Sequence, residues 1–80
     1  MKYKLFTTQF CHRCPSMKEF MASQDKVEGE IVNCSDAPGF EEAKKFDVTG
    51  VPVVVFLDDE GQEVKRCMEP SEVEEFLGNL

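Results

Sequence analysis

The chain has 80 residues, which is enough for one small domain and too few for two. We therefore expect residues 1–80 to form a single domain. It carries 16 Asp and Glu against 9 Lys and Arg, a net charge of −7, and its sequence has no cluster of basic residues. Such a chain repels phosphate backbones and anionic lipids, so we exclude nucleic acids and membranes as partners.

Hydropathy along the sequence gives no membrane or secretion signal. The longest apolar run, residues 51–57, is far shorter than the ~20 residues that a membrane-spanning helix needs. Residues 1–10 hold no sustained apolar segment of the kind that directs secretion. We expect a cytoplasmic protein.

The first half of the chain alternates between strand-like and helix-like segments. Residues 2–7 predict a strand that leads into a pair of cysteines, and a helix follows with Pro15 in its first turn and its end at residues 24–26. Residues 27–33 predict a second strand, and Ser35 or Asp36 can cap a second helix. The side chains expected to face the core are Cys14, Met17, Phe20 and Met21 of the first helix and Phe40, Ala43 and Phe46 of the second.

The second half predicts a hairpin and a last helix. Residues 51–57 are β-branched through the middle, which is typical of a central strand covered on both faces. Residues 58–61 form a turn with Gly61 available for positive φ, and residues 62–67 return as an edge strand. A capping box at residues 71–74 opens a helix, and the order is βαβαββα. The residues that this helix should bury are Val73, Phe76, Leu77 and Leu80.

Cys11 and Cys14 form the only Cys-x-x-Cys pair, and they lie between the first strand and the first helix. The helix N-terminus, together with the basic side chains of His12 and Arg13, should favour the thiolate form of Cys11 at neutral pH. A zinc site usually needs four ligands, often from a second such pair, which this chain lacks. We therefore favour a redox pair, with a metal site that adds Cys34 as an alternative.

Three segments resemble the thioredoxin/glutaredoxin superfamily: residues 10–15, residues 49–57 and the turn at residues 58–61. The resemblance covers nearly the whole chain. It implies a thioredoxin-like α/β fold of glutaredoxin size, with a four-stranded mixed sheet in the order 2-1-3-4 flanked by three helices. The third strand would run antiparallel to the first.

The resemblance also implies a role for each site residue. Cys11 would be the exposed nucleophile and Cys14 the buried resolving thiol, and the Val51–Pro52 peptide bond would be cis. The residues expected to contact the substrate are Phe10, Gly50, Val51 and Pro52. No bound cofactor or metal is expected, because the Cys11–Cys14 disulfide itself carries the electrons.

The implied activity is thiol–disulfide exchange with protein disulfides. Glutaredoxins that bind glutathione generally carry a Lys and an aromatic residue where this chain has Thr8 and Arg13, and they have a Gly-Gly segment that is absent here. We therefore expect a flavin reductase of the thioredoxin-reductase type as the electron donor, ribonucleotide reductase as a candidate partner, and a monomer. The alternatives are a glutathione-dependent glutaredoxin and, in another class, a metal- or cluster-binding module or non-catalytic redox sensor using Cys11, Cys14 and Cys34.

Cys34 and Cys67 should not pair with each other. The implied strand order places them about three strand spacings apart, near 14 Å, whereas a disulfide allows only ~7 Å between Cα atoms. Cys34 falls at the end of its strand that faces the Cys-x-x-Cys pair, so it is a candidate secondary thiol. Cys67 is expected to be a packing residue.

Overall fold

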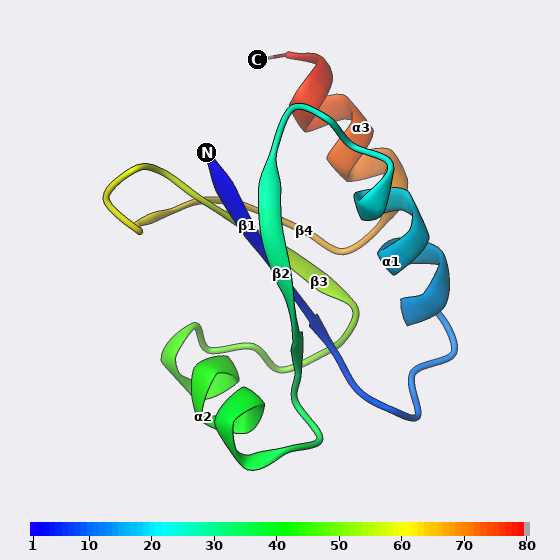
Figure 1. Ribbon diagram of the computed structural model, residues 1–80, viewed down its shortest axis with the longest axis vertical. Helices are drawn as coiled ribbons and strands as arrows, with labels where there is room; N and C mark the ends of the chain where they lie inside the picture. Colours follow the sequence, from blue (N-terminus) through cyan, green and yellow to red (C-terminus); the bar gives the residue numbers. More distant parts are fainter. Residues whose placement is uncertain (80) are drawn as a thin grey trace.

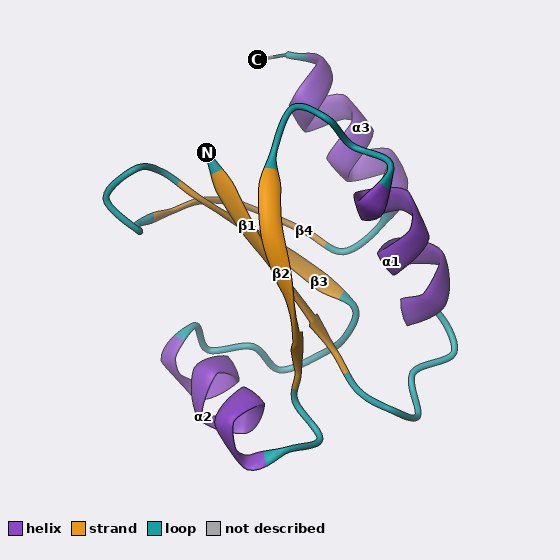
Figure 2. Ribbon diagram, viewed as in Figure 1, coloured by secondary structure: helices purple, strands orange, loops and turns teal. Residues whose placement is uncertain are grey.

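Four strands and three helices make up the protein in the computed structural model, which describes residues 1–79 (Figures 1 and 2). The elements are β1 (Lys2–Thr7), α1 (Cys14–Ala22), β2 (Glu28–Asn33), α2 (Ala37–Lys45), β3 (Val53–Leu57), β4 (Glu63–Cys67) and α3 (Pro70–Gly78). The predicted order of elements is confirmed. None of the helices in this part of the chain is both long and apolar enough to cross a membrane.

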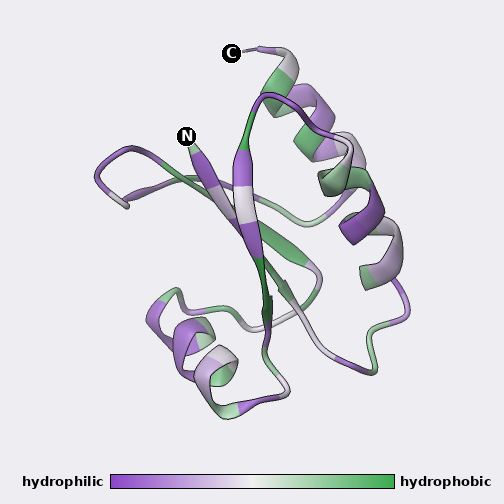
Figure 3. Ribbon diagram, in the orientation of Figure 1, coloured by the Kyte–Doolittle hydropathy of each residue, from purple (hydrophilic) through white to green (hydrophobic). Residues whose placement is uncertain are grey.

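The four strands form one sheet in the order β2-β1-β3-β4, as predicted. β1 pairs with β2 in parallel and with β3 antiparallel, and β3 pairs with β4 antiparallel. Every residue of β3 is buried, and Figure 3 shows this strand as a continuous hydrophobic segment. A strand covered on both faces has no polar side to show, which explains its unbroken apolar sequence.

The register brings one end of every strand to the same side of the molecule. Thr7 at the end of β1 pairs with Asn33 at the end of β2, and Val54 near the start of β3 pairs with Cys67 at the end of β4. We call this side the disulfide end, because residues 8–14 leave β1 there and contain the Cys11–Cys14 disulfide. The opposite side, with residues 23–27 and the turn at 58–62, is the far end.

Helices cover the sheet on both faces, and each face has its own core. α1 and α3 lie on one face and α2 on the other (Figure 1). On the first face the ring of Phe56 packs against Phe76, with centroids 4.8 Å apart. On the second face Phe6 packs against Phe46 at 5.9 Å. The core therefore rests on apolar packing and does not depend on a disulfide framework.

The boundaries of the first two helices differ little from the prediction. α1 ends at Ala22, slightly earlier than predicted. The hydroxyl of Ser23 donates a hydrogen bond to the Phe20 carbonyl at 2.7 Å, and the Ser23 backbone N–H donates to the same carbonyl. Asp36 caps α2, because its Oδ1 accepts a hydrogen bond from the Gly39 N–H at 2.8 Å. This cap is one of the two that the sequence indicated.

The prediction that Phe40 faces the core is wrong. Its side chain is 54% exposed, whereas Gly39 and Ala43, one helical turn apart, are the buried residues of α2. A Cβ atom at Gly39 would collide with the backbone carbonyl of Asn33. The helix thus approaches the end of β2 so closely that glycine is needed there, and this contact turns Phe40 outward.

The predicted capping box of α3 is also wrong. The helix begins at Pro70, so Ser71 lies inside its first turn, and Glu69 is the cap residue without a side-chain cap bond. Instead the carboxylate of Glu72 accepts a hydrogen bond from the Met68 N–H at 3.1 Å. Proline at the start explains the shift, since it lacks an N–H that would need a partner.

The buried face of α3 matches the prediction within residues 1–79. Val73 and Leu77 are buried, and Phe76 packs partly buried against the same core. Leu80, also predicted to be buried, lies outside the described residues. At the turn before β4, Gly61 has φ of 82°, the positive value expected there.

One ion pair ties α2 to β1. Lys4 Nζ hydrogen-bonds to the carboxylate of Glu42 on α2 and lies 3.1 Å from Glu30 Oε1 on β2. The Lys4 hydrogen bond holds the pKa of Glu42 below its ordinary value, and the same contact raises the pKa of Lys4. A carboxylate with a lowered pKa stabilises the fold above its unfolded pKa and loses that contribution as the pH falls through the folded-state pKa.

Glu42→Gln is therefore expected to lower the free energy of unfolding by about 1 kcal/mol at pH 7. The difference from wild type should shrink below about pH 4.3, the ordinary glutamate pKa, as the wild-type carboxylate becomes protonated. Urea unfolding at several pH values measures this. Glu41→Gln, an exposed site on the same helix, is the control and should change little. An effect of Glu42→Gln that does not depend on pH would contradict the assignment.

Candidate active site

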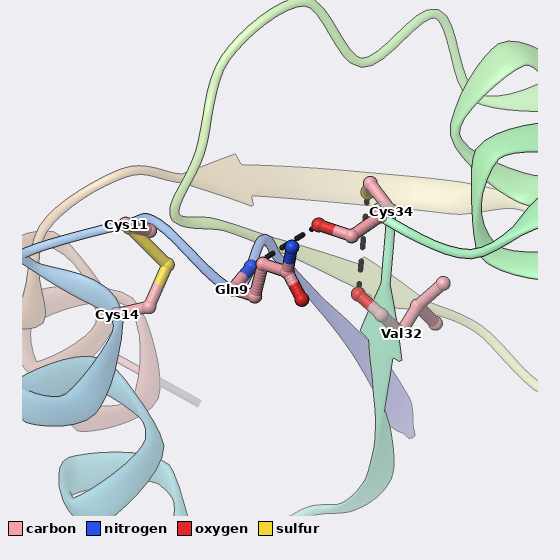
Figure 4. Close-up of a disulfide and its surroundings, with 6 residues drawn as sticks. Gln9, Cys11, Cys14, Val32 and Cys34 are labelled. Atoms are coloured by element: carbon pink, nitrogen blue, oxygen red, sulfur yellow. Dashed lines mark hydrogen bonds between the residues drawn. A yellow bond between two sulfur atoms is a disulfide. The ribbon is translucent and has the colours of Figure 1, made fainter.

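Cys11 and Cys14 are joined in a disulfide at the start of α1, with Cα atoms 5.4 Å apart (Figure 4). Cys14 is the first residue of the helix and is 1% exposed, whereas Cys11 lies in the preceding loop and is partly exposed. Cys11 is therefore the cysteine of this disulfide that lies at the surface, and Cys14 is the one covered by protein.

The start of α1 favours negative charge. Arg13 is the cap residue and provides no side-chain cap bond, Pro15 occupies the first turn, and no acidic residue lies in that turn. Backbone N–H groups at a helix start and the positive end of the helix dipole stabilise an anion. A cysteine that loses its proton at this position gains from both.

His12 and Arg13 are exposed beside the disulfide. The Nη2 atom of Arg13 donates to Glu69 Oε1 at 3.3 Å, and both side chains are more than half exposed. Glu69 therefore joins the site from the loop between β4 and α3. Sequence reasoning missed it, because 56 residues separate the two charges and no local pattern signals the contact.

The segment before β3 lies beside the cysteine pair. The Val51–Pro52 peptide bond is cis, and Pro52 is buried in the wall of a depression that His12 and Arg13 also line. The position of a Cβ atom on Gly50 would meet nothing within 4 Å, so this backbone faces open space.

Large apolar side chains stand exposed at the disulfide end. Phe10, directly before Cys11, is 80% exposed, and Met68, directly after β4, is half exposed. Met68 lines the same depression as Pro52 and was not singled out in the sequence, where it is one methionine in a loop. The candidate site residues Phe10, Cys11, His12, Arg13, Cys14, Gly50, Val51 and Pro52 all lie at this end of the sheet.

Cys34 lies next to the loop that carries Cys11. Its backbone N–H donates to the Thr7 carbonyl at 2.7 Å, and Ser35 Oγ accepts from the Gln9 N–H at 3.1 Å. Figure 4 draws Gln9 and Cys34 together with the disulfide. Burial raises the pKa of the Cys34 thiol, and the charge of Asp36 adds to this, while a hydrogen bond with the Thr7 backbone opposes it. The raised pKa favours the thiol form of Cys34 over the thiolate.

Cys67 is fully buried under α1 and α3, and burial, with a smaller effect of Glu72, raises the pKa of its thiol. Cys34 packs against the core on the other face of the sheet. Neither is part of a disulfide, so they do not pair with each other, as predicted, and the sheet itself separates them. Within residues 1–79, no three side chains of His, Cys, Asp or Glu are grouped so that they could hold a metal ion.

A thioredoxin-like sheet that presents a Cys-x-x-Cys disulfide at a helix start defines a thiol–disulfide oxidoreductase. The chain is 35% identical over 72 residues to the SPbeta prophage-derived thioredoxin-like protein YosR of Bacillus subtilis strain 168, with 88% of this chain and 86% of YosR covered. It belongs to the family of thioredoxin-like proteins. No protein-family model matches the chain.

Solved structures share the same fold. Oxidised thioredoxin O2 of Arabidopsis thaliana superposes with a TM-score of 0.84 at 15% identity, over 99% of this chain and 73% of that one. Thioredoxin 1 of Thermosipho africanus gives a TM-score of 0.68 at 22% identity, over 98% of this chain and 96% of that one. These likenesses confirm the predicted thioredoxin-like fold.

Proposed function

We propose that this protein is an electron carrier that reduces protein disulfides by cycling Cys11 and Cys14 between dithiol and disulfide. The observation that carries the proposal is the unequal exposure of the two cysteines of one disulfide: Cys11 is partly exposed and Cys14 is buried. A thiol that attacks must reach its substrate, and a thiol that resolves must reach only its neighbour.

The reaction has two exchange steps. The Cys11 thiolate attacks one sulfur of the substrate disulfide, which forms a Cys11–substrate disulfide and releases the other substrate sulfur as a thiolate that takes up a proton. The Cys14 thiol gives up its proton and attacks Cys11, which forms the Cys11–Cys14 disulfide and releases the second substrate thiol. Two electrons pass from the protein to the substrate.

The surrounding residues support these steps in different ways. His12 and Arg13, with the N-terminus of α1, stabilise the Cys11 thiolate electrostatically. Phe10, Gly50, Val51 and Pro52 form the surface on which an extended substrate segment lies. Within residues 1–79, the buried polar side chain is Thr7, which is not a carboxylate. The proton of Cys14 therefore passes to water or to the substrate.

A second dithiol must restore the reduced form. We assign this role to a flavin reductase of the thioredoxin-reductase type, because Thr8 and Arg13 replace residues that glutathione-binding glutaredoxins generally use. The carrier would act as a single-domain monomer in the cytoplasm on protein disulfides, and ribonucleotide reductase is a candidate substrate.

Reduction of insulin disulfides tests the proposal. With NADPH and thioredoxin reductase we expect turnover, measured as NADPH oxidation, and with NADPH, glutathione reductase and glutathione we expect at least about tenfold less. Efficient turnover with glutathione would instead indicate a glutaredoxin.

Cys34→Ser separates the carrier from the alternatives that use three cysteines. Because Cys34 lies outside the exchange steps, this variant should keep at least about half of the wild-type rate. Loss of activity in Cys34→Ser, or stoichiometric metal in the purified wild-type protein, would favour a metal-binding module. Reversible oxidation without any insulin reduction would favour a redox sensor.

A further inference from the structure

Two depressions at the disulfide end each have one residue of the Val51–Pro52 dipeptide in the wall. The first, about 190 Å³, lies between the start of α1 and the loop before α3 and has Arg13, Pro52 and Met68 in its wall. The second, about 180 Å³, lies between α2 and the loop before β3 and has Val51 and Phe40 in its wall. Val51 and Pro52, which are neighbours in the chain, thus line one depression each, and the disulfide lies beside this dipeptide.

The charge of these depressions is opposite to that of the protein. Among the described residues that line them, none is acidic, whereas Arg13 and Lys44 are basic, in a chain of net charge −7. Lys44 Nζ lies 5.4 Å from the ring centre of Phe40, so it stands over an exposed apolar surface. A depression of about 710 Å³ at the far end, in contrast, has five acidic residues in its wall. These are Asp25, Glu28, Asp58, Asp59 and Glu60.

Glu69 is the acidic group that faces the first depression, through its contact with Arg13. Both side chains are more than half exposed, and exposed ion pairs are weak because water screens them. The Arg13 guanidinium can therefore leave Glu69 for another carboxylate at little cost. A guanidinium also binds a carboxylate with two parallel hydrogen bonds when the geometry allows.

We propose that the preferred substrate is a polypeptide segment with an acidic residue two positions from its disulfide cysteine, bound with that carboxylate on Arg13. In an extended chain, residues two positions apart face the same side, so the cysteine and the acidic residue both face this protein. The residue two positions away in the other direction then faces Phe40 and is expected to be apolar. This inference rests on the proposed function and names its substrate class.

Peptides that differ at one position test the substrate class. Each carries one cysteine as a 2-thiopyridyl disulfide, with Glu, Gln or Lys two positions away and leucine two positions away on the other side. Stopped-flow release of thiopyridone by the reduced protein gives the rate constant. We expect the Glu peptide to react about tenfold faster than the Lys peptide at low salt, and the ratio to fall toward one as salt screens the charges.

Three variants locate the effect. Arg13→Gln should bring the ratio of the Glu peptide rate to the Gln peptide rate to one. Glu69→Gln removes the competing carboxylate and should raise the Glu peptide rate about threefold. The side chain of Glu69 makes no cap hydrogen bond to α3, so this change leaves the helix start intact. Lys2→Gln changes the net charge by the same amount as Arg13→Gln but at the far end, so it should leave the ratio unchanged.

Equal rates for the three peptides would overturn this inference while leaving the proposed function intact, provided that insulin is still reduced. If the ratio of the Glu peptide rate to the Gln peptide rate fell to one in Lys2→Gln as it does in Arg13→Gln, the inference would also be overturned, because net charge alone would then be the cause. Faster reaction with the thiopyridyl disulfide of glutathione than with the Glu peptide would overturn the choice of a polypeptide. Reaction with neither the peptides nor insulin would overturn the proposed function itself.

Discussion

Cys14→Ser is expected to trap the substrate as a stable disulfide with Cys11. The first exchange step needs only the accessible thiolate of Cys11, so it proceeds, but the second step has no attacking sulfur. Steady-state reduction of insulin should fall by more than about a hundredfold, because removing one member of a catalytic pair stops the whole cycle. Mass spectrometry of the incubated variant should show one substrate chain per protein, released by dithiothreitol.

Cys11→Ser is the matched variant and should trap nothing. Cys14 is 1% exposed at the start of α1, so it cannot reach a substrate disulfide even though its thiol remains. A covalent adduct in Cys11→Ser would reverse the roles of the two cysteines. The double variant Cys14→Ser/Cys34→Ser should trap the same amount of substrate as Cys14→Ser alone, because Cys34 lies outside the two exchange steps.

The regular parts of the fold could be predicted because their patterns are local. The apolar run at residues 51–57 predicted a strand buried on both faces, and Val53–Leu57 is that strand. The helix after Cys14 followed from the spacing of Met17 and Met21, both of which are buried. These patterns depend on one segment facing one core, so the sequence of that segment is sufficient.

The capping box of α3 failed for a local reason, the proline at the helix start, but the misplaced Phe40 and the missed Arg13–Glu69 contact arose where two segments meet. The helical spacing of Phe40 with Ala43 and Phe46 predicted that its side chain faces the core. The close approach of Gly39 to the Asn33 carbonyl instead turns the Phe40 side chain outward. The contact of Arg13 with Glu69 joins residues 56 positions apart. Neither feature can be found from a single segment, because each depends on the distance between two elements in the folded chain.

The stability of the fold must come from its core rather than from the disulfide. Cys11 and Cys14 are three positions apart, and a loop this short restricts the unfolded chain less than the longer loops of a disulfide framework do. A carrier also has to stay folded when the disulfide is reduced in every cycle. The two apolar cores therefore have to hold the site in both redox states, and Phe56 at the centre of the larger one is the place to test this.

Phe56→Ala is expected to lower the free energy of unfolding by about 3–5 kcal/mol, in the oxidised and in the reduced protein alike. Phe56 is fully buried, and its ring packs between Tyr3 at 6.5 Å and Phe76 at 4.8 Å. A loss of this size is a large share of the stability of a small domain. Urea unfolding followed by circular dichroism, with and without dithiothreitol, measures it.

Phe40→Ala removes the same side chain from an exposed position and should change the free energy of unfolding by less than about 0.5 kcal/mol. Phe56→Leu keeps most of the buried volume and should cost less than about 1.5 kcal/mol, so it remains measurable if Phe56→Ala is too unstable to fold. Equal losses in Phe40→Ala and Phe56→Ala would mean that α2 packs Phe40 inward, as its helical spacing alone predicts. A large loss in Phe56→Ala confined to the reduced protein would mean that the disulfide, and not the core, holds the oxidised form together.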